Sequence, residues 1–319
     1  MISIACDFGG TNIKIGILKD GKVVRKSSIE AFSHMGIEYQ LKNVEVEIKK
    51  LLQDSNYELQ DCSGIGIAIP GLVDNKEKRV LSINEKYKDA ETFEFKEWAE
   101  VKLGLPLVMD NDANLALLGE TKAGCAKGSE DAVLMILGTG IGTAAVINGK
   151  LLRGKHYQAG CLGGHFITKV NGKKCTCGSI GCIEAQIGSW AIPDEAASFK
   201  EFPGSMLAKC ELIDVKNVIL CMDKGDTFAS AFFNHLIDNW SAAVVNLIHA
   251  YDPEVIILSG GIMKAGNKIL KPLSEKVWQM AWTPWGKVQF LLAEDPDTSV
   301  LLGIEYLLKE AILNENAQL

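Results

Sequence analysis

The sequence predicts an α/β protein built in two lobes, and three observations lead to this fold class. The chain of 319 residues is long enough for about two domains. Short apolar runs typical of buried strands alternate with amphipathic helical patterns. Two strand–glycine–strand hairpins, over residues 2–17 and 131–147, can face each other and hold the phosphates of one nucleotide from two lobes. We assign residues 1–110 and the final helix, about 300–319, to an N-terminal lobe, and residues 111–299 to a C-terminal lobe.

Composition excludes several classes of protein. With 47% hydrophobic and 23% charged residues, the chain is typical of a globular protein and not of a disordered one. A net charge of −7 argues against a nucleic-acid surface, which needs clustered Lys and Arg. No apolar run reaches the ~18 residues of a membrane span. Nine cysteines, without a signal-peptide pattern at the start, favour a reducing, cytoplasmic location with metal-bound or free thiols.

The first hairpin starts with an apolar run that ends in Asp7, turns at Gly9-Gly10-Thr11 and continues in period-2 alternation to Ile17. Paired glycines let backbone N–H groups face an anion, and the Thr11 hydroxyl adds a donor. These residues taken alone also fit a plain hairpin turn.

The rest of the N-terminal lobe alternates helix and strand. We expect an amphipathic helix over 37–52 and strands over 63–70 and 105–109. Asn84 lies in a polar stretch, where it either meets a ligand or is solvated. Residues 110–114, Asp-Asn-Asp-Ala-Asn, open the next helix. They are natural N-caps, or they carry a strand-end carboxylate directed into a cleft, where ligands gather in open α/β sheets.

The second hairpin runs from a strand over 131–137 through Gly138-Thr139-Gly140-Ile141-Gly142 into another strand, which ends at the hairpin turn Asn148-Gly149. Because the dinucleotide fingerprint requires its glycines to open a helix, a Rossmann interpretation fails here. A near-miss P-loop at 149–155 is also discarded, since His156 replaces the required Ser or Thr.

The C-terminal half contains a long helix over 229–250 and a buried strand over 253–258 that runs into Gly260-Gly261. Such a strand–glycine–helix turn allows close approach of an adenine or ribose, or is a simple βα turn. A strand over 289–292 follows, and the final helix, over 300–313, is expected to return to the first domain.

A cysteine cluster follows the second hairpin. Cys175, Cys177 and Cys182 lie within eight residues, and three thiolates with one imidazole suit tetrahedral zinc. His165 is the preferred fourth ligand, with His156 and Cys161 as alternatives, and reduced surface thiols are the interpretation without metal. Four protein ligands would make the metal structural. Glu184 follows the cluster closely, so that its carboxylate and the His165 imidazole would be fixed to bind neighbouring sugar hydroxyls; taken alone, Glu184 fits a solvated carboxylate equally well.

These motifs resemble the ROK family of sugar kinases and sugar-responsive repressors, in order and over nearly the whole chain. The resemblance is carried by residues 7–11, Asn111-Asp112-Ala113-Asn114, residues 138–142, and His165 with the cysteine motif that ends at Glu184; residues 259–261 resemble its adenosine loop. It implies a two-lobed actin/hexokinase-like ATPase fold (ribonuclease H-like), a sugar substrate, ATP with Mg²⁺, structural Zn²⁺ and a homodimer.

The resemblance also implies roles for individual residues. Asp112 would be the general base that takes the proton of the attacking sugar hydroxyl, O6 by default. The remaining roles divide into two sets. Sugar binding would fall to Asn111, His165 and Glu184, with Asn84 and Gly71 as neighbours. Nucleotide binding would fall to Asp7 near Mg²⁺, to Gly9, Gly10, Thr11, Gly138, Thr139 and Gly140 at the phosphates, and to Gly260 and Gly261 at the adenosine.

One position departs from the family pattern. The family usually has Glu three residues before the zinc His, where this chain has Leu162. A leucine accepts no hydrogen bond, and an unpaired hydroxyl in a closed pocket costs about 1–3 kcal/mol. We therefore expect a sugar substituted or apolar at C1 or C2, such as a glycoside or an N-acetyl sugar, unless another residue replaces the missing Glu.

The rival hypothesis is a non-catalytic sugar sensor of the same family. ROK repressors carry an N-terminal helix-turn-helix, for which the sequence before Asp7 leaves no room. The intact Asp112 also favours a kinase. A zinc-only binding module would leave both hairpins unexplained.

Overall fold

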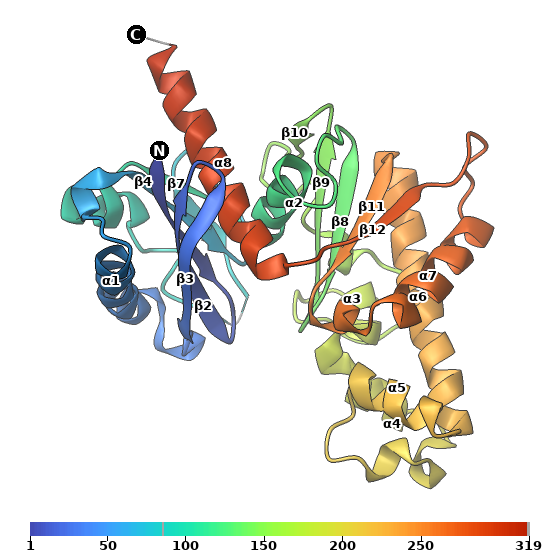
Figure 1. Cartoon of the computed structure of the whole chain (residues 1–319). Coiled ribbons are helices and arrows are strands. Elements are labelled where there is room, and N and C mark those ends of the chain that lie inside the picture. The colour runs from blue at the N-terminus through green and yellow to red at the C-terminus, as the bar shows by residue number, and fades with distance from the viewer. Residues whose placement is uncertain (85, 318–319) are drawn as a thin grey trace. The chain divides into compact units, whose positions relative to one another are not determined.

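The computed structural model describes residues 1–84 and 86–317 (Figure 1). The chain forms two compact units, each with its own sheet and hydrophobic core. Unit 1 comprises Met1–Gly128, Arg153–Ala159 and Glu294–Leu319, and unit 2 comprises Ser129–Leu152 and Gly160–Ala293. The unit 1 boundary therefore falls 18 residues beyond position 110, because helix α2 (Asp112–Lys122) packs along α8 (Pro296–Asn316).

Unit 1 is built on a five-stranded sheet of order β3-β2-β1-β4-β7, in which β1, β2 and β3 are antiparallel and β4 and β7 run parallel to β1. The hairpin expected over residues 2–17 is β1 and β2, and the expected strand over 63–70 is β4. A short ribbon of β5 and β6 follows β4. The strands are β1 Ile2–Phe8, β2 Asn12–Lys19, β3 Lys22–Glu30, β4 Cys62–Ile69, β5 Leu72–Asp74, β6 Arg79–Ser82 and β7 Leu107–Asn111.

Alternation along the strands decides which helix covers which face of this sheet. Ile15, Ile65 and Ile67 belong to the core with helix α1 (Ile37–Asp54). On the opposite face, an added Cβ at Gly66 would overlap Ile304 of α8, and one at Gly64 would come within 2.7 Å of Leu308. The glycine face therefore admits α8 at close range, and the isoleucine face is covered by α1. The return of the final helix to the first domain is confirmed.

Unit 2 repeats the same topology with a sheet of order β10-β9-β8-β11-β12, again with three antiparallel strands followed by two parallel ones. The turn at Asn148-Gly149 has φ values of +50° and +71°, as the predicted hairpin turn requires. The strands are β8 Ala132–Leu137, β9 Ile141–Ile147, β10 Lys150–Leu151, β11 Val255–Ser259 and β12 Gln289–Leu292.

The helices of unit 2 pack around α6 (Thr227–Tyr251), whose buried side chains join those of the sheet in one core. Asp226 caps α6 by accepting hydrogen bonds from the Phe228 and Ala229 amides, and its other oxygen accepts from Met206 and Leu207. The other helices are α3 Ile183–Ile187, α4 Ile192–Ala197, α5 Val215–Asp223 and α7 Asn267–Met280. Among the described residues, no helix is both long and apolar enough to cross a membrane.

Candidate active site

The first glycine turn lies between β1 and β2 of unit 1. A Cβ added at Gly9 would stand 2.7 Å from the Asn12 carbonyl oxygen, and one at Gly10 would stand 2.7 Å from the Lys86 ammonium nitrogen. The Tyr87 hydroxyl donates to the Gly9 carbonyl at 2.7 Å and so helps to fix the turn. Position 9 is therefore confined to glycine, and the Lys86 ammonium lies against the backbone at Gly10, where a cation and free N–H groups favour an anion.

Asp7, at the end of β1, is nearly buried, with 5% of its surface exposed. Burial raises the pKa of its carboxyl to about 6, while the Lys14 ammonium, 3.4 Å from Oδ2, acts in the opposite direction. Lys14 also pairs with Asp297 at 2.7 Å. Lys14 therefore holds two carboxylates beside the glycine turn and is a site residue that the sequence analysis missed. Period-2 alternation on β2 was the one available signal.

The turn from β7 into α2 separates the two interpretations that the sequence left open. Asn111 is the N-cap: its Oδ1 accepts from the amides of Ala113 at 3.0 Å and Asn114 at 3.2 Å. Its Nδ2 donates to the Gly71 carbonyl at 2.9 Å, which leaves one N–H for a ligand. Asn111 is thus the N-cap, while the Asp112 carboxylate meets the helix start through Oδ1, which accepts from the Ala113 amide at 2.9 Å.

Asp112 is half-buried at the start of α2. Burial raises the pKa of its carboxyl. The opposite effect, a lowering of the pKa, comes from the Ala113 amide and from the Lys86 and Lys14 ammonium groups. A general base needs a carboxyl whose pKa is raised by its surroundings and whose ionised form is still stabilised by nearby cations. Asp112 has such an environment.

Gly71 and Asn84 belong to the same region of unit 1. Gly71 has φ +102°, and an added Cβ would overlap the Ser82 carbonyl oxygen, so only glycine brings this carbonyl to Asn111. Asn84 is exposed two residues after Ser82, and its carbonyl accepts from the Lys86 amide at 2.8 Å. The turn that carries Asn84 therefore also carries the Lys86 cation, which the sequence analysis did not single out.

In unit 2, three sequence-predicted segments converge on Ile141, the first residue of β9. Glu184 Oε2 accepts from the Ile141 amide at 2.8 Å, and a Cβ added at Gly140 would overlap the same carboxylate. On the other side, a Cβ added at Gly164 would overlap the Ile141 carbonyl. The glycine loop, the Glu184 carboxylate and the turn that bears His165 are thereby fixed relative to one another.

The adenosine-loop candidate meets the same loop. Gly260 has φ +97°, and an added Cβ would overlap the carbonyl oxygen of Leu137, the residue before Gly138. Gly261 starts a short 3-10 turn, and α7 begins only at Asn267. The second glycine loop closes on itself, since the Gly138 amide donates to the Gly140 carbonyl at 3.1 Å. The Thr139 carbonyl accepts from the Trp190 amide at 3.3 Å.

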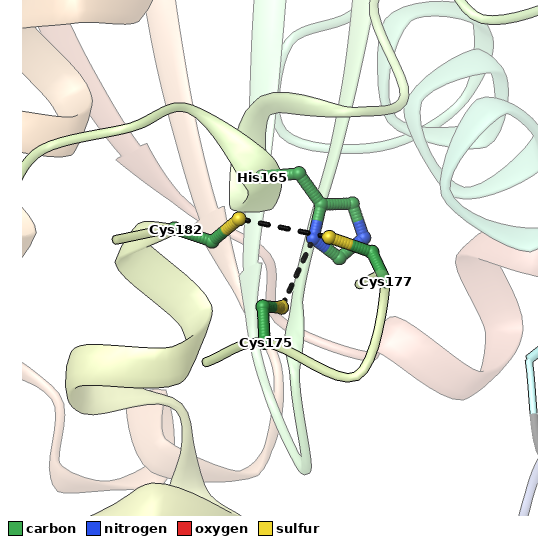
Figure 2. Close-up of side chains that lie close together, drawn as sticks. All are labelled: His165, Cys175, Cys177 and Cys182. Carbon is green, nitrogen blue, oxygen red and sulfur yellow. Dashed lines mark hydrogen bonds between the residues drawn. The ribbon is translucent and has the colours of Figure 1, made fainter. Parts of the chain in front are cut away.

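His165, Cys175, Cys177 and Cys182 form one cluster in which all four ligand atoms lie within 4.8 Å of one another (Figure 2). His165 Nδ1 lies 3.6 Å from Cys175 Sγ, and Cys177 Sγ lies 3.6 Å from Cys182 Sγ. A tetrahedral zinc ion with bonds of about 2.3 Å to sulfur and about 2.0 Å to nitrogen would hold nitrogen and sulfur about 3.5 Å apart and two sulfurs about 3.8 Å apart.

The donor set and its spacing therefore fit tetrahedral zinc, and His156 and Cys161 lie outside the cluster. Because Nδ1 faces the thiols, Nε2 is the His165 atom left for a ligand. The turn that leads to His165 is tied to β9: the Thr143 hydroxyl donates to the Gly160 carbonyl at 2.6 Å and accepts from the Gly163 amide at 2.8 Å. Leu162, half-buried, lies between these two contacts.

Comparison with known proteins agrees with this geometry. The model of the ROK family matches residues 3–311. The glucokinase of Halalkalibacterium halodurans is 32% identical over 279 residues, 85% of this chain and 84% of that protein. A beta-glucoside kinase of Listeria innocua is 27% identical over 265 residues, 81% of this chain and 82% of that protein.

The crystal structure of a ROK family glucokinase from Streptomyces griseus, in complex with glucose and AMPPNP, is similar to this one with a TM-score of 0.79 at 26% identity, covering 97% of this chain and 100% of that chain. This likeness confirms the predicted two-lobed actin-like ATPase fold. Since the family model spans almost the entire sequence, the chain belongs to the ROK family.

Proposed function

We propose that this protein is an ATP-dependent sugar kinase, with Asp112 as its general base. The observation that carries the proposal is the β7–α2 turn, where Asn111 takes the capping role and leaves a half-buried carboxylate with raised pKa beside Lys86 and Lys14. The glucokinase relatives, and a fold neighbour in complex with glucose and AMPPNP, support a hexose and ATP as substrates.

In the proposed reaction, the sugar hydroxyl oxygen forms a bond to the γ-phosphorus while the bond from that phosphorus to the bridging β,γ-oxygen breaks. ADP takes the electrons of that bond, and Asp112 accepts the hydroxyl proton. An Asp suffices as base because the proton becomes labile only as the new P–O bond forms. We expect the hydroxyl at C6 to be the nucleophile, as the family resemblance implies.

Phosphate binding is assigned to the two glycine turns, at residues 9–11 and 138–140. The backbone N–H groups of Gly10, Thr11, Thr139 and Gly140, the Thr11 and Thr139 hydroxyls and the Lys86 ammonium are the donors assigned to the phosphate oxygens. The Gly9 and Gly138 amides already donate within the turns. Gly260 and Gly261 are assigned to the adenosine. Mg²⁺ would be held near Asp7 and would supply neutralisation of the phosphate charge. The buried Asp7, held by Lys14, supplies one fixed carboxylate for this purpose.

Sugar hydroxyls are assigned to atoms that the internal contacts leave free. These are one Nδ2 hydrogen of Asn111, Nε2 of His165 and Oε1 of Glu184, since the other polar atoms of these side chains are already engaged. Zn²⁺ at the four-residue cluster would act structurally, by holding the His165 imidazole in one orientation. Asn84 and Gly71 are assigned to the rim of the sugar site.

Leu162 suggests which sugar is bound. It stands where the family usually has a hydroxyl-accepting Glu, and its apolar side chain favours a substituent at C1 or C2 of the sugar over a free hydroxyl. The kinship to a beta-glucoside kinase supports a glycoside as one such substrate.

A panel of phosphoryl acceptors tests this proposal. ADP release from Mg-ATP is followed with glucose, N-acetyl hexosamines and β-glucosides, and the phosphorylated position is read by NMR. We expect turnover that depends on the sugar and is faster on substituted sugars than on glucose. Equal rates on glucose would overturn the role of Leu162. Saturable sugar binding without turnover on any acceptor would overturn the kinase and identify a sensor.

Location and assembly are proposed from the cysteines, the composition and the family resemblance. All nine cysteines lie among the described residues and none forms a disulfide, which agrees with the proposed cytoplasmic location. The family resemblance implies a homodimer, and the net charge of −7 and the lack of a membrane-length apolar run favour a protein that needs neither nucleic acid nor membrane. Light scattering of the purified protein tests the dimer, and a monomeric mass at working concentration would contradict it.

A further inference from the structure

A buried charge stands immediately before the proposed catalytic residues. Asp110 is the penultimate residue of β7 and only 1% exposed. Its Oδ1 accepts from the Asn111 amide at 2.7 Å and from Asn114 Nδ2 at 2.9 Å. These contacts build the carboxylate into the turn that carries Asn111 and Asp112. Both donors are neutral, so they orient the carboxylate without cancelling its charge.

The neutralising cation comes from 43 residues away. Arg153 donates to Asp110 Oδ2 from Nε at 2.8 Å and from Nη2 at 2.6 Å, and its side chain is 23% exposed. Residues 153–159 belong to unit 1, although the chain on both sides of them belongs to unit 2. The segment is closed by a hydrogen bond from the Ala159 amide to the Arg153 carbonyl at 3.1 Å.

A second contact anchors the same segment to unit 1. The Tyr157 side chain is hydrogen-bonded to the Asp74 carboxylate. Burial raises the pKa of the Asp74 carboxyl, but this bond and those from the Glu77 and Lys76 amides outweigh burial and lower the pKa. Arg153 is therefore not a surface side chain that happens to reach an acid. It is presented by a closed loop that contacts two carboxylates of unit 1, Asp110 through Arg153 and Asp74 through Tyr157.

We propose that Arg153 is a positioning residue for the catalytic turn: by pairing with Asp110, it fixes the Asn111–Asp112 turn and cancels a charge that would otherwise act on Asp112. The proposal rests on the proposed kinase function, because the reaction it serves is proton removal by Asp112. Asp110 has no other cationic partner among the described contacts.

The electrostatic part of the proposal has a definite sign. The charged groups that act on Asp112 are Lys86 from the turn after β6, Lys14 from β2 and Asp7 from β1, and Asp110 lies two residues before it in the chain. With Arg153 in place, Asp110 and Arg153 together are neutral. Removing the guanidinium leaves a like charge beside Asp112, which favours the protonated form of the base and weakens it at a given pH.

The test compares Arg153→Met with Arg153→Lys, and with the double variant Asp110→Asn/Arg153→Met. Arg25→Met is the matched control, since Arg25 is an exposed arginine of the same unit that donates to the Asp54 carbonyl. We expect Arg153→Met to lower kcat by about 100-fold, with little change in KM for ATP. The acid limb of kcat/KM should move up by about one pH unit.

Asp110→Asn alone completes the comparison. The double variant should have a kcat close to that of Asp110→Asn, and so recover most of the kcat that Arg153→Met loses. Its acid limb should return to the wild-type position, because no buried charge is left unpaired. Unchanged kcat and acid limb in Arg153→Met, or losses that add in the double variant, would overturn the proposal. If Arg153→Met does not fold, Arg153→Lys decides. It keeps the charge with a single ammonium, so we expect kcat to fall about tenfold with an unmoved acid limb, and wild-type kcat would overturn the proposal.

A readout that needs no turnover separates this proposal from the kinase itself. The carboxyl ¹³C resonance of Asp112, assigned with Asp112→Asn, is titrated in wild type and in Arg153→Met. A higher Asp112 pKa in the variant supports the proposal even if no sugar is phosphorylated. An unchanged pKa overturns it even if the protein is an active kinase.

Discussion

Replacing Glu184 should separate two functions of one carboxylate. Its Oε2 accepts from the Ile141 amide at 2.8 Å, and Ile141 is only 5% exposed. Glu184→Ala leaves that amide without its acceptor, at a cost of about 1–3 kcal/mol in the free energy of unfolding. Glu184→Gln keeps an oxygen in the same place, so most of this stability should remain. We therefore expect the thermal midpoint to rank wild type, Gln, Ala, with a loss of a few degrees for Ala.

The proposed sugar contact gives a second ranking. A hydrogen bond from a sugar hydroxyl to the ionised Oε1 contributes about 1.5–3 kcal/mol, which corresponds to an increase of about 10- to 150-fold in KM for the sugar when the carboxylate is deleted. Glu184→Gln should give an intermediate KM, because it retains an acceptor without charge. KM for ATP should change less, since Glu184 meets the glycine loop at the Ile141 amide and at Gly140 and is assigned no contact with a phosphate.

The assays are differential scanning fluorimetry and steady-state kinetics with the sugar varied, and the exposed Glu211→Ala is the control. The reasoning about the loop is refuted if Glu184→Ala melts at the wild-type temperature. The reasoning about the sugar is refuted if KM for the sugar is unchanged in Glu184→Ala while its midpoint falls, because the carboxylate would then serve the loop alone.

Three further predictions concern the metal, the backbone and pH. Cys177→Ser should lower bound zinc from one ion per chain, measured by elemental analysis, and lower the thermal midpoint; wild-type zinc content would contradict the cluster. Gly71→Ala should destabilise the fold by about 1–3 kcal/mol in chemical denaturation and raise KM for the sugar, because φ +102° is strained for alanine and the Asn111 contact shifts. Glu195 pairs with His235 at 2.9 Å and with Lys173 at 2.8 Å, and these two contacts lower the pKa of the Glu195 carboxyl from 4.5 to about 2 against the effect of burial. Its stabilisation is therefore full above its unfolded pKa and is lost as pH falls from about 4.5 to about 2. Glu195→Gln should flatten the unfolding free energy over that window, and an unchanged slope would contradict the pairing.

Hydrophobic periodicity located the elements whose faces are buried and missed those without a buried face. The first hairpin, α1 and α6 were predicted within a few residues because their apolar side chains repeat at the strand or helix period. Strand β3 was missed because none of its residues is buried: it lies at the sheet edge, where alternation carries no apolar signal. The identical order of the two sheets was visible in the sequence only as the paired hairpins.

The site was predictable where one short segment carries several functional side chains. The sequence analysis grouped His165 with Cys175, Cys177 and Cys182, and the structure brings these four together. Contacts between distant segments left no such signal. Glu184 meets Ile141 across 43 residues, and Arg153 meets Asp110 across the same separation. A separation of 43 residues along the chain is also found between charged residues that never meet, so it predicts no contact.

The most direct test of the central claim is sugar-dependent ADP release by wild type and by Asp112→Asn, measured on the best acceptor of the panel. Loss of one positioned base predicts a fall in kcat of about 10²- to 10⁴-fold, with KM for the sugar nearly unchanged because the sugar contacts lie on Asn111, His165 and Glu184. An Asp112→Asn enzyme that turns over at the wild-type rate, or ADP release that ignores the sugar, would contradict the account.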